Sequence, residues 1–177
     1  MSTGQVLIYK APGSLLRHIE WTISGVTQEA VNLTWLANPE TPGTFRSRCD
    51  YSGQPDAGAT LASAFMNLKQ ITFEIIQDAS EAGLGSRWSF IPNHGIFRGS
   101  TDEAGNLLVS ENQLRLAMEL SGSNALKLQA EIRKLLGQAY DDELEGYREL
   151  ICGTESYHGV VTAEAERVAY GQNVRPI

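Results

Sequence analysis

The chain has 177 residues, of which 42% are hydrophobic and 20% charged, and its net charge at pH 7 is −7. This composition is typical of a soluble globular protein and argues against whole-chain disorder. The acidic balance also argues against a general nucleic-acid binder, because such proteins cluster Lys and Arg to neutralise phosphates.

Membrane insertion and secretion are not expected from the sequence. No stretch reaches the ~20 apolar residues that a membrane-spanning helix requires. The apolar run at residues 6–9 is too short for a signal peptide. We therefore expect a cytoplasmic protein.

Hydrophobic periodicity over residues 5–78 predicts the order strand, helix, strand, strand, helix, strand. Apolar residues alternate with polar ones at 31–35, 45–51 and 71–75, which predicts three strands after the first one at 6–9. This order is typical of a split β-α-β (ferredoxin-like) unit, an antiparallel sheet with both helices on one face.

The second half of the chain is predicted to extend and cover that sheet. Two strands, 87–91 and 95–99, flank a turn, and a short strand follows near 107–109. Ser110 with Gln113 forms a capping-box pattern that opens a helix. Apolar residues at helical spacing then predict one amphipathic helix over 128–139.

We therefore predict a single α+β domain over residues 1–152. Its parts are a core at about 4–78, a strand extension at 84–109 and covering helices at 110–150. Residues 153–177 are predicted to form a polar C-terminal tail.

The sequence carries no motif that predicts a cofactor or a metal. It has no glycine-rich phosphate loop before a helix, no nucleophile motif and no metal-ligand spacing around its three histidines. Cys49 lies in a strand pattern, where a small buried side chain is expected in preference to a reactive thiol. The acids at 141–143 are expected to interact with a helix dipole and to face solvent.

The segment 87–98 is the best candidate for a binding site, because it combines aromatic, imidazole and guanidinium groups. Arginine binds carboxylate or phosphate with two parallel hydrogen bonds, and a histidine at a turn titrates near neutral pH. The predicted ligand-binding residues are Arg46, Arg48, Arg87, Trp88, His94 and Arg98. The alternative is a structural hairpin with aromatic residues in the core and arginines paired to neighbouring acids.

Three functional hypotheses remain at this point. The leading one is a non-catalytic protein that binds a protein partner or a small anionic metabolite, with a homodimer through a sheet face or edge as one form. The second is a transferase or hydrolase acting on an anionic or acyl substrate, with His94 as base, Arg87 and Arg98 as anion clamp and an acid from 141–145 as partner. The third is an assembly or structural factor with an exposed apolar patch.

Several segments together resemble a known family: MSTGQVLIYKAP at the start, 18–21, 42–44, 87–97 and above all LLGQAYDDELE at 135–145. Over roughly residues 1–150 the chain resembles an actinobacterial family of uncharacterised proteins, domain of unknown function, family 3145. The resemblance implies a cytoplasmic protein with no assigned activity, so it transfers no catalytic residue. It also implies a setting near acyl metabolism.

Overall fold

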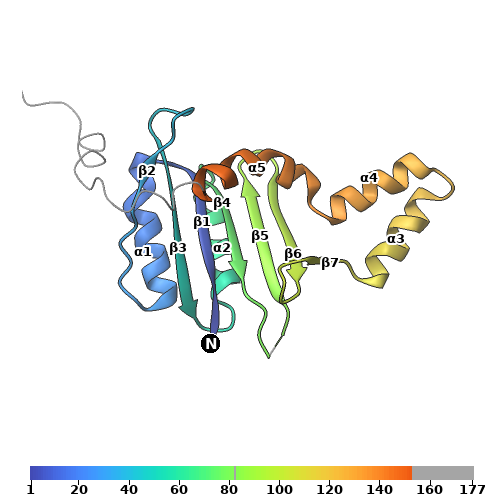
Figure 1. Cartoon of the computed structure of the whole chain (residues 1–177), viewed down its shortest axis with the longest axis horizontal. Coiled ribbons are helices and arrows are strands. Elements are labelled where there is room, and N and C mark those ends of the chain that lie inside the picture. The colour runs from blue at the N-terminus through green and yellow to red at the C-terminus, as the bar shows by residue number, and fades with distance from the viewer. Residues whose placement is uncertain (82, 153–177) are drawn as a thin grey trace, which may run out of the picture.

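A computed structural model of the chain describes residues 1–81 and 83–152. Within these residues, seven strands form one antiparallel sheet (Figure 1): β1 (Ser2–Pro12), β2 (Leu36–Ala37), β3 (Thr44–Gly53), β4 (Thr72–Gln77), β5 (Gly85–Ile91), β6 (Gly95–Thr101) and β7 (Leu107–Leu108). The helices of the same region are α1 (Leu16–Thr27), preceded by a 3-10 turn at Gly13–Leu15, then α2 (Ala57–Met66), α3 (Glu111–Ser121), α4 (Ala125–Leu135) and α5 (Gln138–Cys152).

The N-terminal half has the predicted split β-α-β arrangement. In the sheet order β2-β3-β1-β4-β5-β6-β7, β3 lies between β1 and β2, and β4 lies on the other side of β1. Helices α1 and α2 pack on one face of the sheet, and α5 crosses the opposite face (Figure 1). The predicted α+β class is confirmed, and so are the β5–β6 strand pair and the capping box that opens α3.

The main core lies between the sheet and the pair α1 and α2. Period-two alternation directs every second strand residue to this face, where it meets the apolar sides of both helices. Its buried members include Val6, Ile8, Ile19, Ile23, Phe45, Tyr51, Leu61, Phe65, Ile71, Phe73, Ile75, Trp88 and Phe90. Burial of each such side chain stabilises the fold by roughly 1.5–3 kcal/mol.

A smaller core lies between the other face of the sheet and α5. A bulge in β1 between Ile8 and Ala11 shifts the register with both neighbouring strands. Tyr9, at this bulge, is fully buried on the α5 side with Ile91 and Leu144. Tyr9 follows Ile8 by one residue, so strand alternation directs its aromatic ring to the face under α5.

The predicted strand over 31–35 is wrong, because this segment bonds to a helix side chain. The Glu20 carboxylate on α1 accepts hydrogen bonds from the Leu33 backbone N–H (3.1 Å) and from Trp35 Nε1 (3.0 Å). These two N–H groups therefore have their hydrogen-bond acceptor on a helix and not on a neighbouring strand. Between α1 and β3, strand pairing is limited to the two residues of β2, which pair with β3.

The predicted single helix over 128–139 is also wrong, because Gly137 divides it into α4 and α5. Gly137 has φ +69°, a left-handed conformation in which glycine commonly ends a helix. A Cβ at this position would lie 2.7 Å from the Phe97 ring. The acids at 141–143 consequently lie within α5, near its start.

Of the helices predicted to cover the sheet, α5 lies across it, whereas α3 and α4 extend beyond the β7 edge (Figure 1). They pack on each other, and α4 also contacts α5. We call residues 111–135 the α3–α4 hairpin. The predicted tail, residues 153–177, lies outside the described residues.

No helix in the described part of the chain is both long enough and apolar enough to cross a bilayer.

Glycine-to-alanine substitutions test the α4–α5 joint. Gly137→Ala adds a Cβ against Phe97 at a positive φ, so we expect it to lower the free energy of unfolding by about 2 kcal/mol or more. Gly146→Ala, inside α5 with open space around it, should raise that free energy by roughly 0.5–1 kcal/mol. Urea denaturation measures both, and equal effects of the two substitutions would contradict this account of the joint.

Candidate functional site

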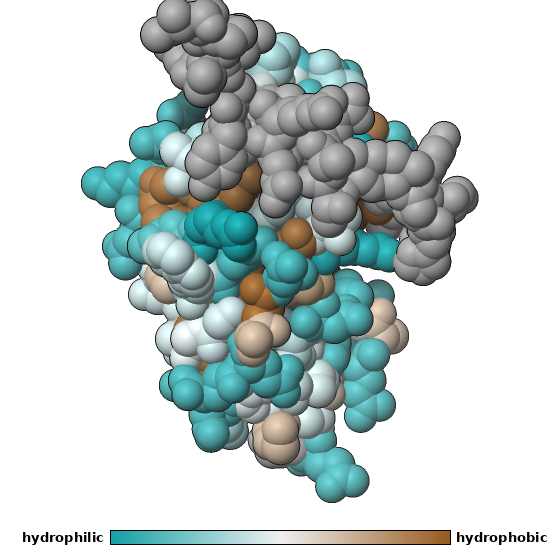
Figure 2. All heavy atoms as spheres, turned by 90° about the vertical axis from the view of Figure 1, so that its left-hand side faces the viewer, coloured by the Kyte–Doolittle hydropathy of each residue, from teal (hydrophilic) through white to brown (hydrophobic). Residues whose placement is uncertain are grey.

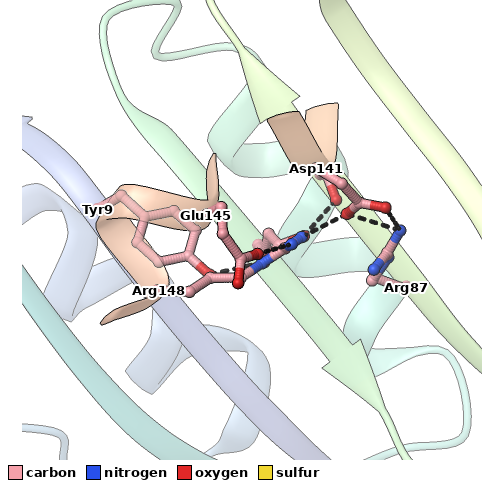
Figure 3. Close-up of polar contacts among 7 residues, drawn as sticks. Tyr9, Arg87, Asp141, Glu145 and Arg148 are labelled. Atoms are coloured by element: carbon pink, nitrogen blue, oxygen red, sulfur yellow. Dashed lines mark hydrogen bonds and ion pairs between the residues drawn. The ribbon is translucent and has the colours of Figure 1, made fainter. Parts of the chain in front are cut away.

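A network of charged and polar side chains lies between α5 and the sheet face that α5 covers (Figure 3). We call it the α5 network. Strands β1, β4 and β5 contribute four of its members and α5 contributes three: Tyr9, Glu74, Arg87, Ser89, Asp141, Glu145 and Arg148.

Glu74 is the centre of the α5 network and is only 1% exposed. Its Oε1 accepts hydrogen bonds from Ser89 Oγ (2.6 Å) and Arg148 Nη2 (2.7 Å). Its Oε2 accepts from Tyr9 OH (2.6 Å) and Arg148 Nε (2.9 Å). Arg148 thus binds the carboxylate with two parallel hydrogen bonds, the strongest geometry for this pair.

These contacts fix the protonation states of Glu74 and Tyr9 near neutral pH. Burial alone would raise the pKa of Glu74, but the hydrogen bonds from Arg148, Ser89 and Tyr9 outweigh it and lower that pKa. Burial, together with the adjacent Glu74 carboxylate, raises the pKa of Tyr9. Glu74 is therefore ionised, and the Tyr9 phenol keeps the proton that it donates to Glu74.

Asp141 connects the buried pair to a second arginine. Its Oδ1 accepts from Arg148 Nη2 at 2.8 Å and lies 3.2 Å from Arg87 Nη2 (Figure 3). Arg148 Nη1 also reaches Glu145 at 3.3 Å, and the Arg87 guanidinium lies 5.7 Å from the centre of the Phe97 ring. Partial burial alone would lower the pKa of Arg148, but Glu74 and Asp141 raise it.

His94 lies in the turn between β5 and β6 and contacts the N-terminal part of α5. Its Nδ1 is 3.3 Å from Glu143 Oε2, and both side chains are 46% exposed. Tyr140 OH donates to the His94 carbonyl oxygen at 3.0 Å, and the two rings meet edge to face. The structure thus brings His94 to an acid of the 141–145 segment.

The two arginines of the predicted anion clamp lie on opposite faces of the sheet. Trp88 pairs directly with Arg98 across the β5–β6 ladder, so both side chains are on the α2 face, where the Arg98 guanidinium lies 5.5 Å from the Trp88 ring. Arg87, next to Trp88, is on the α5 face and binds Asp141. Strand rise also separates Arg87 from the start of the His94 turn by about 13 Å. No clamp therefore forms around His94.

The two other predicted contributors lie on β3, on the face that α5 partly covers. Arg46 Nη1 donates to the Ala37 carbonyl oxygen (2.7 Å) and to Asn38 Oδ1 (3.4 Å), and burial lowers its pKa. Arg46 therefore holds β2 against β3. Arg48 is exposed and lies opposite Leu7 of β1.

The described residues offer little for covalent or metal chemistry. No group of three or more His, Cys, Asp or Glu side chains that could hold a metal ion occurs in this part of the chain. Cys49 packs against the main core, and burial, with Asp50 nearby, raises its thiol pKa to about 11. At neutral pH Cys49 is therefore a protonated thiol and not an attacking thiolate.

Sequence reasoning missed the centre of the α5 network, although two signals point to it. Glu74 is the one charged residue of β4, where it lies between Phe73 and Ile75, and a charge in a covered strand needs a partner. Arg148 is the one basic residue in α5. Together these signals indicate an ion pair between β4 and the covering helix.

The comparisons with known proteins give a family and no activity. Residues 5–158 match the model of a family described as protein of unknown function (DUF3145). The chain belongs to this family. No curated protein and no solved structure matches the chain significantly. The sequence resemblance to family 3145 is thereby confirmed, and the role of the protein must be inferred from its geometry.

Removing Arg148 tests whether the buried pair holds α5. Arg148→Met leaves Glu74 buried without its cation, so we expect a loss of about 3 kcal/mol or more in the free energy of unfolding. The double variant Glu74→Met with Arg148→Met should recover much of this loss, because no unpaired charge remains. As a control, Glu111→Gln removes an exposed ion pair with Arg115 and should change stability little. An Arg148→Met protein as stable as the wild type in urea would refute this role.

The lowered pKa of Glu74 predicts the sign of a pH effect. A carboxyl group with a lower pKa in the folded state contributes stability above its unfolded pKa, about 4.3 for Glu, and loses that contribution as the pH falls through the folded value. The unfolding free energy of the wild type should therefore decrease more steeply below about pH 4.3 than that of the Glu74→Met, Arg148→Met variant. Urea titrations at several acidic pH values measure the two slopes, and parallel slopes would be the contrary result.

Proposed function

We propose that this chain is a non-catalytic cytoplasmic protein that acts by binding another protein through the α3–α4 hairpin. The occupant that fits this surface is a second helical surface with apolar side chains flanked by charges of both signs. One observation carries the proposal. Large apolar side chains between 39 and 78% exposed gather on the hairpin and directly after it: Leu114, Leu116, Met118, Leu120, Leu126 and Leu136.

Concentrated exposure of this kind is unusual for a surface that faces only water. Single exposed apolar residues are common, but contiguous apolar patches mark interaction sites. At the end of the molecule farthest from the hairpin, hydrophilic side chains and apolar areas both reach the visible surface (Figure 2). The support for binding at the hairpin is therefore the number of large apolar side chains exposed there.

The contacts of the arginines bear on whether the partner is a protein or a small anion. Arg87 binds Asp141, Arg46 binds the β2 segment, and Arg98 lies over Trp88. Three of the arginines predicted to bind an anion thus already have contacts within the chain. This engagement favours a protein partner over a small anionic metabolite.

A second candidate function is a transferase or hydrolase acting on an anionic or acyl substrate. The proximity of His94 Nδ1 to Glu143 Oε2 favours it, because a base oriented by a carboxylate is a common catalytic arrangement. A thermal-shift screen with acyl-CoA and phosphorylated metabolites tests this candidate. Stabilisation that His94→Ala abolishes would support the enzyme, and a flat response would remove it.

Site-specific photo-crosslinking in living cells tests the binding proposal. A photo-reactive amino acid in place of Leu116 on α3 should form a discrete adduct, because this side chain is at the proposed contact. The same amino acid in place of Ser63, an exposed residue of α2, is the control and should form none. Mass spectrometry identifies the adduct. No adduct at 116, or equal adducts at both positions, would overturn the proposal.

A further inference from the structure

We propose that the hairpin binds the hairpin of a second copy of this chain, so that two hairpins form a four-helix bundle in a symmetric dimer. This inference rests on the proposed function and names its partner. It follows from three features of the hairpin: a small internal core, apolar residues on two sides of α3, and opposite net charges on its two helices.

The core within the hairpin is too small for two helices of this length. The fully buried residues of α3 are Ala117 and Ser121, and α4 has none. Two 11-residue helices are individually marginal in water and need an apolar face buried against a partner. Several larger side chains that could supply such a core, Leu116, Leu120 and Leu126 among them, are instead exposed to solvent.

The exposed residues of α3 lie on two sides of the helix. Leu114 and Met118 lie on one side of the buried Ala117, about 60° and 100° around the helix from it. Leu116 and Leu120 lie on the other side of Ala117, about 100° and 60° around the helix from it. Leu116 and Leu120 are both more than half exposed, so neither is buried against the α4 of its own hairpin. A four-helix bundle buries both sides, because each helix then has two neighbours.

Local sequence signals hold the hairpin in shape without a large core. Ser110 and Gln113 form a reciprocal capping box at the start of α3, and Asn124 Oδ1 accepts from the Lys127 backbone N–H at 3.0 Å at the start of α4. Such caps each stabilise a helix by roughly 1 kcal/mol. The hairpin is therefore ordered before it binds, which lowers the entropic cost of association.

The charges of the two helices favour a second copy as the partner. Helix α3 carries two acids and one base, a net charge of −1: Glu111, Arg115 and Glu119. Helix α4 carries three bases and one acid, a net charge of +2: Lys127, Glu131, Arg133 and Lys134.

Some of these charges are already paired within their own helix, and others are not. Arg115 pairs with Glu111, and Lys134 pairs with Glu131. The remaining charges of the hairpin have no ion-pair partner within the described ranges: Glu119, Lys127 and Arg133. In a twofold dimer, α3 of each copy faces α4 of the other. The acidic helix and the basic helix therefore meet at two symmetric contacts.

Sedimentation of the full-length protein tests the dimer. The wild type should sediment as a dimer at high concentration. Leu116→Lys with Leu120→Lys should raise the dissociation constant at least about 100-fold. Both side chains are more than half exposed, so circular dichroism should show an unchanged fold. A wild type that stays monomeric at every concentration, or a dimer that both substitutions leave intact, overturns the inference.

A charge-exchange experiment tests the pairing of α3 with α4. Glu119→Lys in one protein, and Lys127→Glu with Arg133→Glu in another, should each weaken self-association, because like charges then face each other. An equal mixture of the two variants should form a heterodimer, because both α3–α4 contacts become complementary again. Restored dimers in the mixture support the inference, whereas a mixture that stays monomeric contradicts it.

The crosslinking experiment separates failure of this inference from failure of the proposed function. An adduct at position 116 with a second copy of the chain supports both. An adduct with a different protein keeps the binding function but rejects the second copy as partner. An adduct within one chain, to residues 153–177, rejects both, because the chain itself then covers the hairpin.

Discussion

A carboxylate buried in a central strand remains ionised only when a cation and hydrogen-bond donors reach it. In this chain the carboxylate is Glu74, and its cation, Arg148, comes from the helix that crosses the sheet. The pair therefore sets where α5 lies. Two contacts set where α5 begins. Gly137 lies close to the Phe97 ring, and Tyr140 OH donates a hydrogen bond to the His94 carbonyl oxygen in the turn between β5 and β6. Since α4 ends at this point, the same contacts direct the α3–α4 hairpin away from the sheet.

The elements that sequence patterns predicted well are those whose polar groups are satisfied locally or by neighbouring strands. Strands β3, β4 and β5 belong to this class, as does the capped start of α3. Prediction failed at 31–35, where Glu20 of a preceding helix accepts the hydrogen bonds that a strand would otherwise make. It failed again over 128–139, because the need for glycine at 137 depends on Phe97, forty residues earlier in the chain. Both failures come from contacts between distant residues, which periodicity does not report.

The candidate site was predictable in part. The hairpin around His94 has the predicted strands and turn, and an acid of the predicted segment lies beside the imidazole. The clamp of Arg87 and Arg98 was wrong for a reason visible in the sequence: in a hairpin with this turn, position 98 pairs with 88, so it lies on the face opposite to 87. The pair of Glu74 with a residue of α5 was missed because the alternating pattern of β4 does not show that the face carrying Glu74 is buried and that the charge needs a partner.

The molecule thus buries an ion pair under α5 and exposes apolar side chains on the α3–α4 hairpin. Because the ion pair fixes α5, it also sets the position of the hairpin that precedes α5. Native-state hydrogen exchange tests this dependence most directly. If the Glu74–Arg148 pair joins α5 to the sheet, the amides around Leu144 should open in the same cooperative step as those of β1 and β4. Exchange of these α5 amides well before the strand amides would contradict the account.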